Sequence, residues 1–533
     1  MKKSYSFALG LIFAFAINTS AQIPGMVDSS FNGNGKVIYD FGFHENLTDV
    51  KVQPFDQKVV TVGTALTPSF SGKLLAIRLL PNGAFDTTFN DSGIVIIPNF
   101  NESYAYETII KDDGKILIAG TAADPNFIFS TLCMQLNSDG SLDSTFGING
   151  FATPRFFAGD EFANGMALQA DGKIVLAGSV LDAGGHNMPS LVRLNQNGSL
   201  DTAFGVGGVA IISVTEIDNK FNNVFLQADG KIVASGHFDQ GLTLSGQFDF
   251  DILVARFTAD GIIDSTFGTS GITLTPISVD YIEDALGMKQ SADGGIVISG
   301  FTTLPDFSFD MILVKYDSVG VLVPTFGSSG IVQFDNDIQD VGYDVTIQSN
   351  GKILVGGTSG GFFFDDRDFL LMRYDANGQV DTTFGNDGLV LTPIMNDFDE
   401  ANAITLQADG KIILAGKANN GSQNDLALVR YWNDVSTGIS EINQSTTVSL
   451  YPNPTKSGNS IVIEWNESAS SNIQLMLMDG FGRTIDQIQI KNQGTDKSKV
   501  VYQFPSTLSN GFYIVNLIQE NGSSITAKVM IQN

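Results

Sequence analysis

Residues 381–388 read DTTFGNDG, and closely related segments recur along the chain at a nearly constant spacing. The steps between successive copies are 58, 57, 58, 63, 59 and 58 residues. The copies begin at Asp28, Asp86, Asp143, Asp201, Asp264, Val323 and Asp381. A period of this length indicates one large repeat architecture rather than a series of unrelated domains.

Two further motifs run in phase with this connector. The first is ADGKIILAG at 408–416, which has a copy in every unit and is weakest as FDQKVVTVG at 55–63. The second is an apolar run with one basic residue, such as LALVRY at 426–431, and Gln135 takes the basic position in one copy. Each unit therefore contains four short β-like runs, a to d, with an Asp-Gly hairpin turn between b and c.

Seven units of four antiparallel strands predict an all-β fold with a seven-bladed β-propeller over residues 22–432. An open solenoid is the structural alternative, but it would need capping units, and the first and last units look ordinary. The connector at 28–35 has no strand d before it, and the last strand d, at 426–431, has no connector after it. If the ring closes, the last strand d is followed in space by the first connector, and the two together complete one unit.

The order of the strands predicts two faces. The b–c turns and the connectors emerge on one face, where we expect Asp and Gly to shape turns and the connector Phe to fill the space between blades. A metal-binding role for these Asp residues is the less favoured interpretation. The a–b and c–d loops emerge on the other face, where the units differ most, and variable loops on a rigid scaffold are the usual place for binding.

The a–b loops are acidic, and carboxylate oxygens suit Ca²⁺, although no loop has EF-hand spacing. Acidic loops that are only solvated are the favoured alternative, so no metal ligand and no cofactor is assigned and calcium remains open. The candidate ligand-binding residues are Asp160, Glu161, Asp280, Glu283, Asp284, Asp340, Asp399 and Glu400; Asp335, Asp337 and Asp397 lie in the same loops.

The c–d loops add aromatic residues that could contact sugars or a partner protein if exposed. Burial between blades is slightly favoured for them. They are Phe127, Phe129, Phe307, Phe309, Phe362, Phe363 and Phe364.

No catalytic residue can be assigned. His44, His186 and His237 lie in different units without a metal-binding pattern, and neither a nucleophile elbow nor a phosphate-binding loop is present. The single cysteine, Cys133, lies in an apolar run and is expected to be buried. The net charge of −28 argues against nucleic acid as a partner and against anionic membrane surfaces.

Residues 1–21 predict a secretory signal peptide. Lys2 and Lys3 precede an apolar stretch at 7–17, and Thr19 and Ala21 suit cleavage before Gln22. No later run approaches the roughly 20 apolar residues of a membrane-spanning helix. We expect a mature protein that is soluble or surface-attached and has no transmembrane segment.

Residues 433–447 read as a linker, and 448–533 contain seven short strand-like runs that suit a β-sandwich. The signatures YPNP (451–454), MDGFGRTI (478–485), NGFYIVNL (510–517) and the final KVMIQN resemble the C-terminal sorting domain of the type IX secretion system of the Bacteroidota. This resemblance implies export by the type IX machinery across the outer membrane, so that the mature protein is either secreted or attached to the outer-membrane surface.

The repeats likewise resemble the delta-60 repeat family, which implies a β-propeller but no reaction and no fixed ligand. The chain departs from that pattern at Val323 and at 55–58, where we expect weakened local turns. The favoured function is a non-enzymatic propeller that binds an extracellular glycan or protein. A secreted hydrolase acting on polysaccharide or another extracellular polymer is the alternative, and a structural surface protein is a third hypothesis. Whether the protein is an enzyme stays open.

Overall fold

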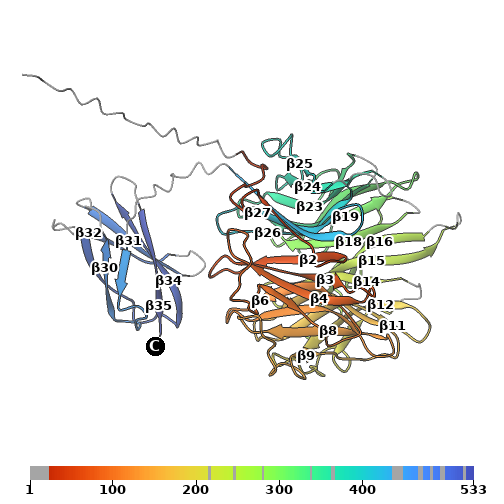
Figure 1. The fold of residues 1–533 in the computed structure, drawn as a ribbon, viewed down its shortest axis with the longest axis horizontal. Helices are drawn as coiled ribbons and strands as arrows, with labels where there is room; N and C mark the ends of the chain where they lie inside the picture. The colour runs from red at the N-terminus through yellow and green to blue at the C-terminus, as the bar shows by residue number, and fades with distance from the viewer. Residues whose placement is uncertain are drawn as a thin grey trace, which may run out of the picture. The chain divides into compact units, whose positions relative to one another are not determined.

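The computed structural model describes residues 23–533 except 214–217, 244–245, 247, 279–280, 337–338, 362–366, 396, 435–447, 466–471, 480–483, 492–497, 520–523 and 533. The predicted signal peptide, most of the linker, Asp280, Asp337 and the three Phe residues at 362–364 lie outside the described residues. Two compact units divide the chain, 1–435 and 436–533. The described part of each consists of β-strands and loops (Figure 1). It contains no helix long and apolar enough to span a bilayer.

The first unit is built from β1–β28. Its inner strands correspond to run b, and they are β2 (Glu45–Val52), β6 (Glu102–Ile110), β10 (Glu161–Leu168), β14 (Lys220–Leu226), β18 (Glu283–Gln290), β22 (Gln339–Ile347) and β26 (Asp399–Leu406). Run c forms β3 (Val59–Leu66), β7 (Ile116–Ala123), β11 (Ile174–Leu181), β15 (Ile232–Leu242), β19 (Ile296–Thr303), β23 (Ile353–Gly360) and β27 (Ile412–Asn419).

The remaining strands lie farther from the centre. Run d forms β4 (Gly72–Leu79), β8 (Phe129–Leu136), β12 (Asn187–Leu194), β16 (Phe248–Phe257), β20 (Phe309–Tyr316), β24 (Arg367–Tyr374) and β28 (Asn424–Tyr431). Run a forms the short outer strands β1 (Lys36–Tyr39), β5 (Ile94–Ile96), β9 (Phe151–Ala152), β13 (Val209–Ile211), β17 (Ile272–Thr275), β21 (Ile331–Phe334) and β25 (Leu389–Thr392).

Run a does not begin the sheet of its own sequence unit. It completes the preceding sheet, as in the order β2-β3-β4-β5, because each connector folds back along strand d. One sheet has eight strands, but its two halves meet at a single parallel pair, Phe309 and Gln339. Dividing the sheet there gives seven four-stranded groups among the described strands.

The ring is closed by the two ends of this unit. The first strand, β1, pairs antiparallel with the last, β28, from Lys36 opposite Val429 to Tyr39 opposite Leu426. The inner strands contact one another in chain order, and β26 contacts β2 again. The predicted β-propeller is therefore confirmed, and its closure uses the unmatched connector and strand as expected.

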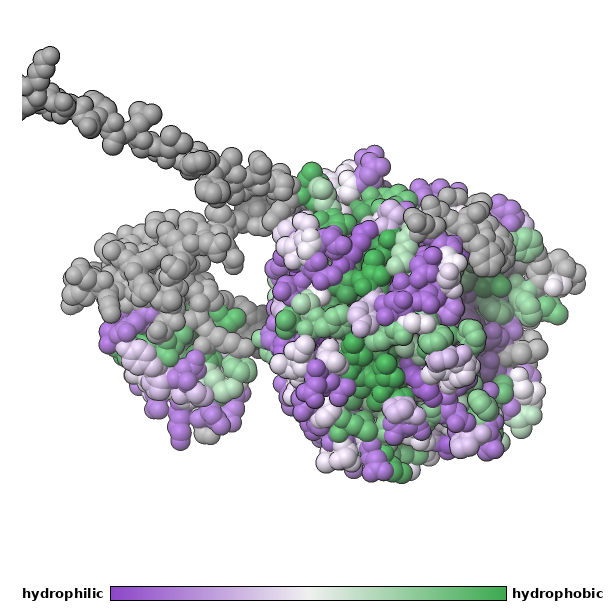
Figure 2. Space-filling view, viewed as in Figure 1, coloured by the Kyte–Doolittle hydropathy of each residue, from purple (hydrophilic) through white to green (hydrophobic). Residues whose placement is uncertain are grey.

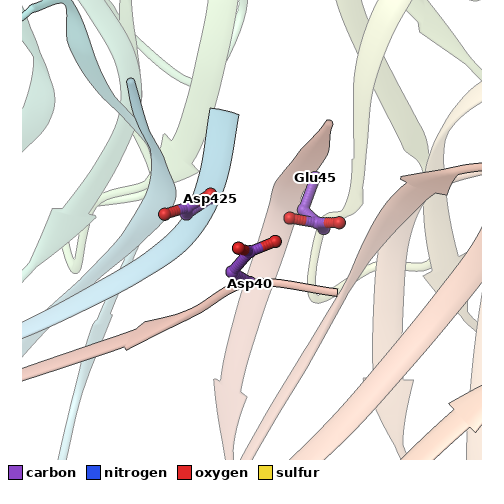
Figure 3. Close-up of side chains that lie close together, drawn as sticks. All are labelled: Asp40, Glu45 and Asp425. Atoms are coloured by element: carbon purple, nitrogen blue, oxygen red, sulfur yellow. The ribbon is translucent and has the colours of Figure 1, made fainter. Parts of the chain in front are cut away.

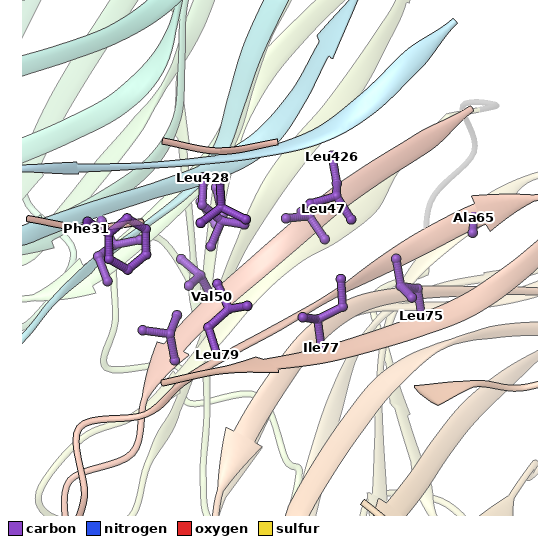
Figure 4. Close-up of a cluster of buried hydrophobic side chains, with 14 residues drawn as sticks. Phe31, Leu47, Val50, Ala65, Leu75, Ile77, Leu79, Leu426 and Leu428 are labelled. Carbon is purple, nitrogen blue, oxygen red and sulfur yellow. The ribbon is translucent and has the colours of Figure 1, made fainter. Parts of the chain in front are cut away.

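The core lies between adjacent sheets. Between the closing sheet and the first one, Leu47 and Val50 of β2 pack with Leu75 of β4 and Leu428 of β28, all fully buried (Figure 4). Each such side chain contributes about 1.5–3 kcal/mol when it leaves water. Strands of the d class are buried on both faces because a sheet lies on either side, which explains their unbroken apolar runs.

The second unit is a small two-sheet structure, as its seven predicted runs suggest. Its strands are β29 (Val448–Tyr451), β30 (Ser460–Trp465), β31 (Asn472–Asp479), β32 (Thr484–Lys491), β33 (Ser498–Gln503), β34 (Gly511–Gln519) and β35 (Ser524–Ile531). The sheets have the orders β29-β30-β33 and β32-β31-β34-β35. Side chains such as Ile463, Leu475, Tyr502 and Val515 form one buried core.

Candidate binding face

The propeller has two faces with different chemistry. The b–c turns and connectors form the repeat face, and the a–b and c–d loops form the variable face. Antiparallel pairing of b, c, d and the following a places these two sets of loops at opposite strand ends.

The repeat face holds a recurring ion-paired cluster. Arg78 Nε donates to Asp86 Oδ2 at 2.7 Å, and the guanidinium carbon lies 4.6 Å from the ring centre of Phe89, which is fully buried. Lys58, from the b–c turn, lies 3.0 Å from the same carboxylate. The cluster returns as Arg193, Asp201 and Phe204; Arg256, Asp264 and Phe267; Arg373, Asp381 and Phe384; and Arg430, Asp28 and Phe31. These Asp residues have their cations within the protein, which supports a structural role.

The two departures from the repeat keep their backbone geometry. At Val323, the Phe326 amide still donates to the Val323 carbonyl at 3.0 Å, and Lys315 pairs with Asp293 at 3.0 Å instead of a connector Asp. In the same unit Gly295 stands at the position where every other b–c turn has a lysine. This unit therefore lacks both the connector carboxylate and the lysine that pairs with it elsewhere. In the first unit Gln57 adopts a φ of 59°, in place of the Asp-Gly glycine.

The variable face presents exposed phenylalanines at its loop tips. Phe70, Phe127 and Phe307 are 69%, 62% and 61% exposed, at the ends of the β3–β4, β7–β8 and β19–β20 hairpins. The longer β15–β16 hairpin adds Leu242 and Phe248, which pair across it and are both exposed. The prediction that the c–d loop aromatics are buried is therefore wrong for Phe127 and Phe307. Phe129 and Phe309 are half-buried.

These three turns share one construction. Each has Pro, then a small polar residue, then Phe, as in Pro125-Asn126-Phe127. The Phe backbone is left-handed, with φ of 59°, 60° and 67° for Phe70, Phe127 and Phe307. This conformation is costly for a bulky residue and suits glycine, so it is an outlier of the kind that clusters at functional sites. The shared Pro-x-Phe pattern is the sequence signal that would have revealed Phe70 as well.

Exposed aliphatic residues also occur on the repeat face, for example Ile148 and Val206 in the connectors. Polar and apolar patches alternate over the side of the propeller shown in Figure 2. Scattered apolar residues of this kind are normal on soluble proteins. The strained Phe tips therefore distinguish the variable face better than apolar exposure alone.

Most of the predicted acidic residues lie at the starts of inner strands, on separate sheets. Four are fully buried: Glu161, Glu283, Asp340 and Asp399. Their carboxylates hold the a–b loops, since Glu161 Oε1 accepts from the amides of Phe156 and Phe157, both at 2.7 Å. Burial raises the pKa of Glu283 to about 7 and that of Asp399 to about 6, and loop amides only partly offset it. The structure thus gives these residues a loop-holding position.

The other candidate acids have partners within the protein. Asp160 Oδ1 accepts from the Phe129 amide at 2.9 Å, and Glu400 lies 2.7 Å from Lys417. Asp284 Oδ2 lies 3.1 Å from His237 Nδ1 and 3.8 Å from Lys220. None of these contacts joins predicted acids from different sheets.

His237 is a buried histidine with a carboxylate near each ring nitrogen. It is 3% exposed and stacks on Phe250 with 4.8 Å between ring centres. Burial alone would lower its pKa, but Asp284 and Asp218 raise it to about 9. The imidazole is therefore cationic at neutral pH and serves as an internal counter-charge.

The centre of the ring is narrow. Each inner strand has a β-bulge at the equivalent place, and several bulge side chains reach the next sheet. Asn164 Nδ2 donates to the Phe221 carbonyl at 2.9 Å, Asn222 to Ala285 at 3.0 Å and Asn402 to Leu47 at 2.9 Å. The sequence interpretation did not identify these inter-sheet bonds.

The cavity enclosed by these strands has about 150 Å³ and contains a charge cluster of half-buried Lys51 and Glu107 with buried Asp49. Lys51 lies 2.7 Å from Asp49 and 3.9 Å from Glu107. Burial raises the pKa of Glu107 to about 7 despite Lys51. A cavity this small holds water or an ion, not a polymer chain. A larger cavity of about 810 Å³, between β17 and 320–322, has no titratable residue in its lining.

Comparisons with known proteins agree with this architecture. Residues 111–146, 169–204, 227–267, 348–384 and 407–434 match a family described as a domain of unknown function (DUF5122) beta-propeller. Residues 449–532 match a secretion system C-terminal sorting domain. No curated protein matches the chain.

Solved structures give only distant similarity. A fungal alcohol oxidase of the AA5 family, in complex with copper, is 12% identical with a TM-score of 0.42, over 94% of this chain and 100% of that one. A polysaccharide lyase of family PL25, an ulvan lyase, is 10% identical with a TM-score of 0.42, over 78% of this chain and 95% of that one. At these values neither carries an argument about function. The family matches do: this chain combines repeats that match the DUF5122 beta-propeller family with a C-terminal segment that matches a secretion system sorting domain, and that segment indicates secretion and cell-surface attachment.

Proposed function

We propose that the mature protein is a non-enzymatic adhesion module of the cell surface or its surroundings, and that the variable face binds another extracellular macromolecule. The observation that carries this proposal is the set of exposed Phe70, Phe127 and Phe307 side chains, each in a left-handed turn on that one face. Strain at three separate loop tips serves no packing purpose, because these rings lie mainly in solvent.

A protein is the class of ligand that the loop tips favour. The three Phe rings are wholly apolar and are the most exposed large side chains of these tips, although the polar residues Ser69, Asn126 and Asp306 stand beside them, and apolar exposure of this kind marks protein interaction sites. The tips belong to different sheets, so they suit an extended partner surface rather than a small molecule. Each buried Phe would contribute about 1.5–3 kcal/mol to binding. An extracellular glycan is the other ligand class to test.

Protein and glycan arrays probed with the mature chain test the proposal. The triple variant Phe70→Gly, Phe127→Gly and Phe307→Gly should weaken binding by at least about 100-fold, since tenfold corresponds to 1.4 kcal/mol. Phe55→Gly is the matched control, because Phe55 is an exposed Phe on the repeat face. Unchanged binding by the triple variant would refute the role of these tips, and turnover of an arrayed polymer would favour the hydrolase hypothesis.

A further inference from the structure

Three carboxylates meet where the ring closes. Asp40 follows β1, Glu45 begins β2 and Asp425 is the second residue of β28. One oxygen from each lies within 4.8 Å of the others (Figure 3). The three side chains come from segments at opposite ends of the propeller sequence, and none was a sequence-predicted candidate.

Glu45 is the unusual member of this group. It is 1% exposed, and neither carboxylate oxygen has a hydrogen-bond partner. Burial raises the pKa of Glu45 to about 7, and the nearby amides of Phe41 and Phe43 offset this only in part because they do not reach hydrogen-bond geometry. A buried carboxylate without hydrogen bonds is costly, so this group requires a positive partner or a proton.

The other two acids face each other across the closing strands. Tyr39 pairs with Leu426, and continuing this register by one residue places Asp40 opposite Asp425. Like charges directly opposite in a sheet are destabilising. Gln423 Nε2 donates to both, at 2.7 Å to Asp40 Oδ1 and 3.2 Å to Asp425 Oδ1, which orients the carboxylates but brings no charge.

Other junctions between sheets supply an internal comparison. Asp251 and Glu283 correspond to Asp425 and Glu45, and so do Asp368 and Asp399, but Pro276 and Pro393 stand where Asp40 would be. A third acid recurs as Asp335, beside Asp310 and Asp340, but these three do not bring their oxygens within the same distance. The complete cluster is thus tied to the junction where the chain ends meet.

We propose that Asp40, Glu45 and Asp425 bind one Ca²⁺ ion that clamps the closure of the propeller. Three carboxylates from the protein suit Ca²⁺, which takes about six to eight oxygen ligands in a flexible geometry, whereas Mg²⁺ usually keeps several waters and is held by one or two carboxylates. Bound there, the ion joins the first strand, the last strand and the first inner strand.

Calcium titration of the full mature chain tests this site after chelator treatment. We expect a dissociation constant of about 10⁻⁴ M, as in extracellular modules. At 5 mM CaCl₂ the melting temperature should rise by about 2–5 °C. Asp40→Asn should abolish both effects, and because Asp40 is exposed this variant should still fold.

Asp251→Asn is the matched control, since its junction carries proline at the third position. It should retain the calcium response of the unaltered chain. No calcium binding, binding that persists unchanged in Asp40→Asn, or an equal response to MgCl₂ would each overturn the proposal. Glu45→Gln provides a second check, because it should weaken binding by at least tenfold and leave Asp40 in place.

Discussion

Arg430 Nε donates a 2.8 Å hydrogen bond to Asp28 Oδ2, although the two residues are 402 positions apart in the chain. In three other repeats the same bond joins residues only eight positions apart, as between Arg193 and Asp201. Asp28 is 1% exposed, and the Arg430 guanidinium also lies 4.7 Å from the Phe31 ring centre. The contact that joins the ends of the propeller is thus the one that three other repeats make internally.

Removing Arg430 should open this closure. Arg430→Met leaves Asp28 buried, with Lys411 at 3.7 Å as its remaining cation, and losing one member of a buried pair costs about 3–5 kcal/mol. Urea denaturation of the mature chain measures the loss. Lys315→Met is the matched control, because its partner Asp293 has a 62% exposed side chain that water can solvate. Equal losses in the two variants would contradict this account.

The connector carboxylates should make stability sensitive to acid. Burial alone would raise the pKa of Asp264, but hydrogen bonds from Thr266 and Lys231 and the charge of Arg256 hold it below its usual range. A carboxyl whose pKa is lowered by folding stabilises the protein above its unfolded value, near 3.8, and loses that contribution as pH falls further.

Asp264→Asn checks that direction. The variant should be less stable than the unaltered chain at pH 7, and the difference should shrink as pH falls below about 4. Urea midpoints at several pH values give the comparison. A difference that stays constant down to pH 2 would show that the carboxylate charge is not the cause.

His237 should make the protein less stable as pH rises, whereas the connector carboxylates make it less stable as pH falls. Its pKa rises from 6.5 to about 9 on folding, so its contribution is complete below pH 6.5 and is lost as pH rises through about 9. The shift corresponds to at most about 3.5 kcal/mol at about 1.36 kcal/mol per pKa unit. His237→Gln should flatten the stability profile between pH 6.5 and 9.5. His186→Gln is the control, and a profile unaltered by His237→Gln would exclude this charge.

The sequence predicts the parts of this fold that repeat. Asp28, Phe31 and Arg430 could be assigned to closure because the same three residue types recur together in other units. The pairing of run a with the preceding sheet could not be predicted, because a connector of this length can fold back on either neighbouring sheet. The cluster of Asp40, Glu45 and Asp425 could not be predicted either, since Asp40 and Asp425 meet only through the β1–β28 register. Local spacing carries no information about such a contact.

The sequence also does not predict which of the acidic loop residues are buried. Asp399 and Asp397 look alike in a polar loop, but Asp399 is fully buried and accepts from the amides of Ile394 and Met395, at 2.7 and 3.1 Å. The strand begins at Asp399, and that start turns its side chain into the junction. The start of the strand therefore decides which carboxylate holds the loop, while Asp397, two residues earlier, stays half-buried.

The strained loop tips predict substitutions that stabilise the fold while removing the proposed binding surface. Phe127 has a φ of 60°, and a non-glycine residue there costs roughly 1–2 kcal/mol. Glycine relieves that strain but gains freedom in the unfolded chain, so Phe127→Gly should stabilise by about 0.5–1 kcal/mol. Gly185 supplies the reverse experiment, because it occupies the same turn position in β11–β12 with a φ of 87°. Gly185→Phe should destabilise by a similar amount, and Phe55→Gly, outside the left-handed region, should not stabilise. Urea denaturation measures all three, and a loss of stability in Phe127→Gly would mean that the ring contributes packing and is not held for an external partner.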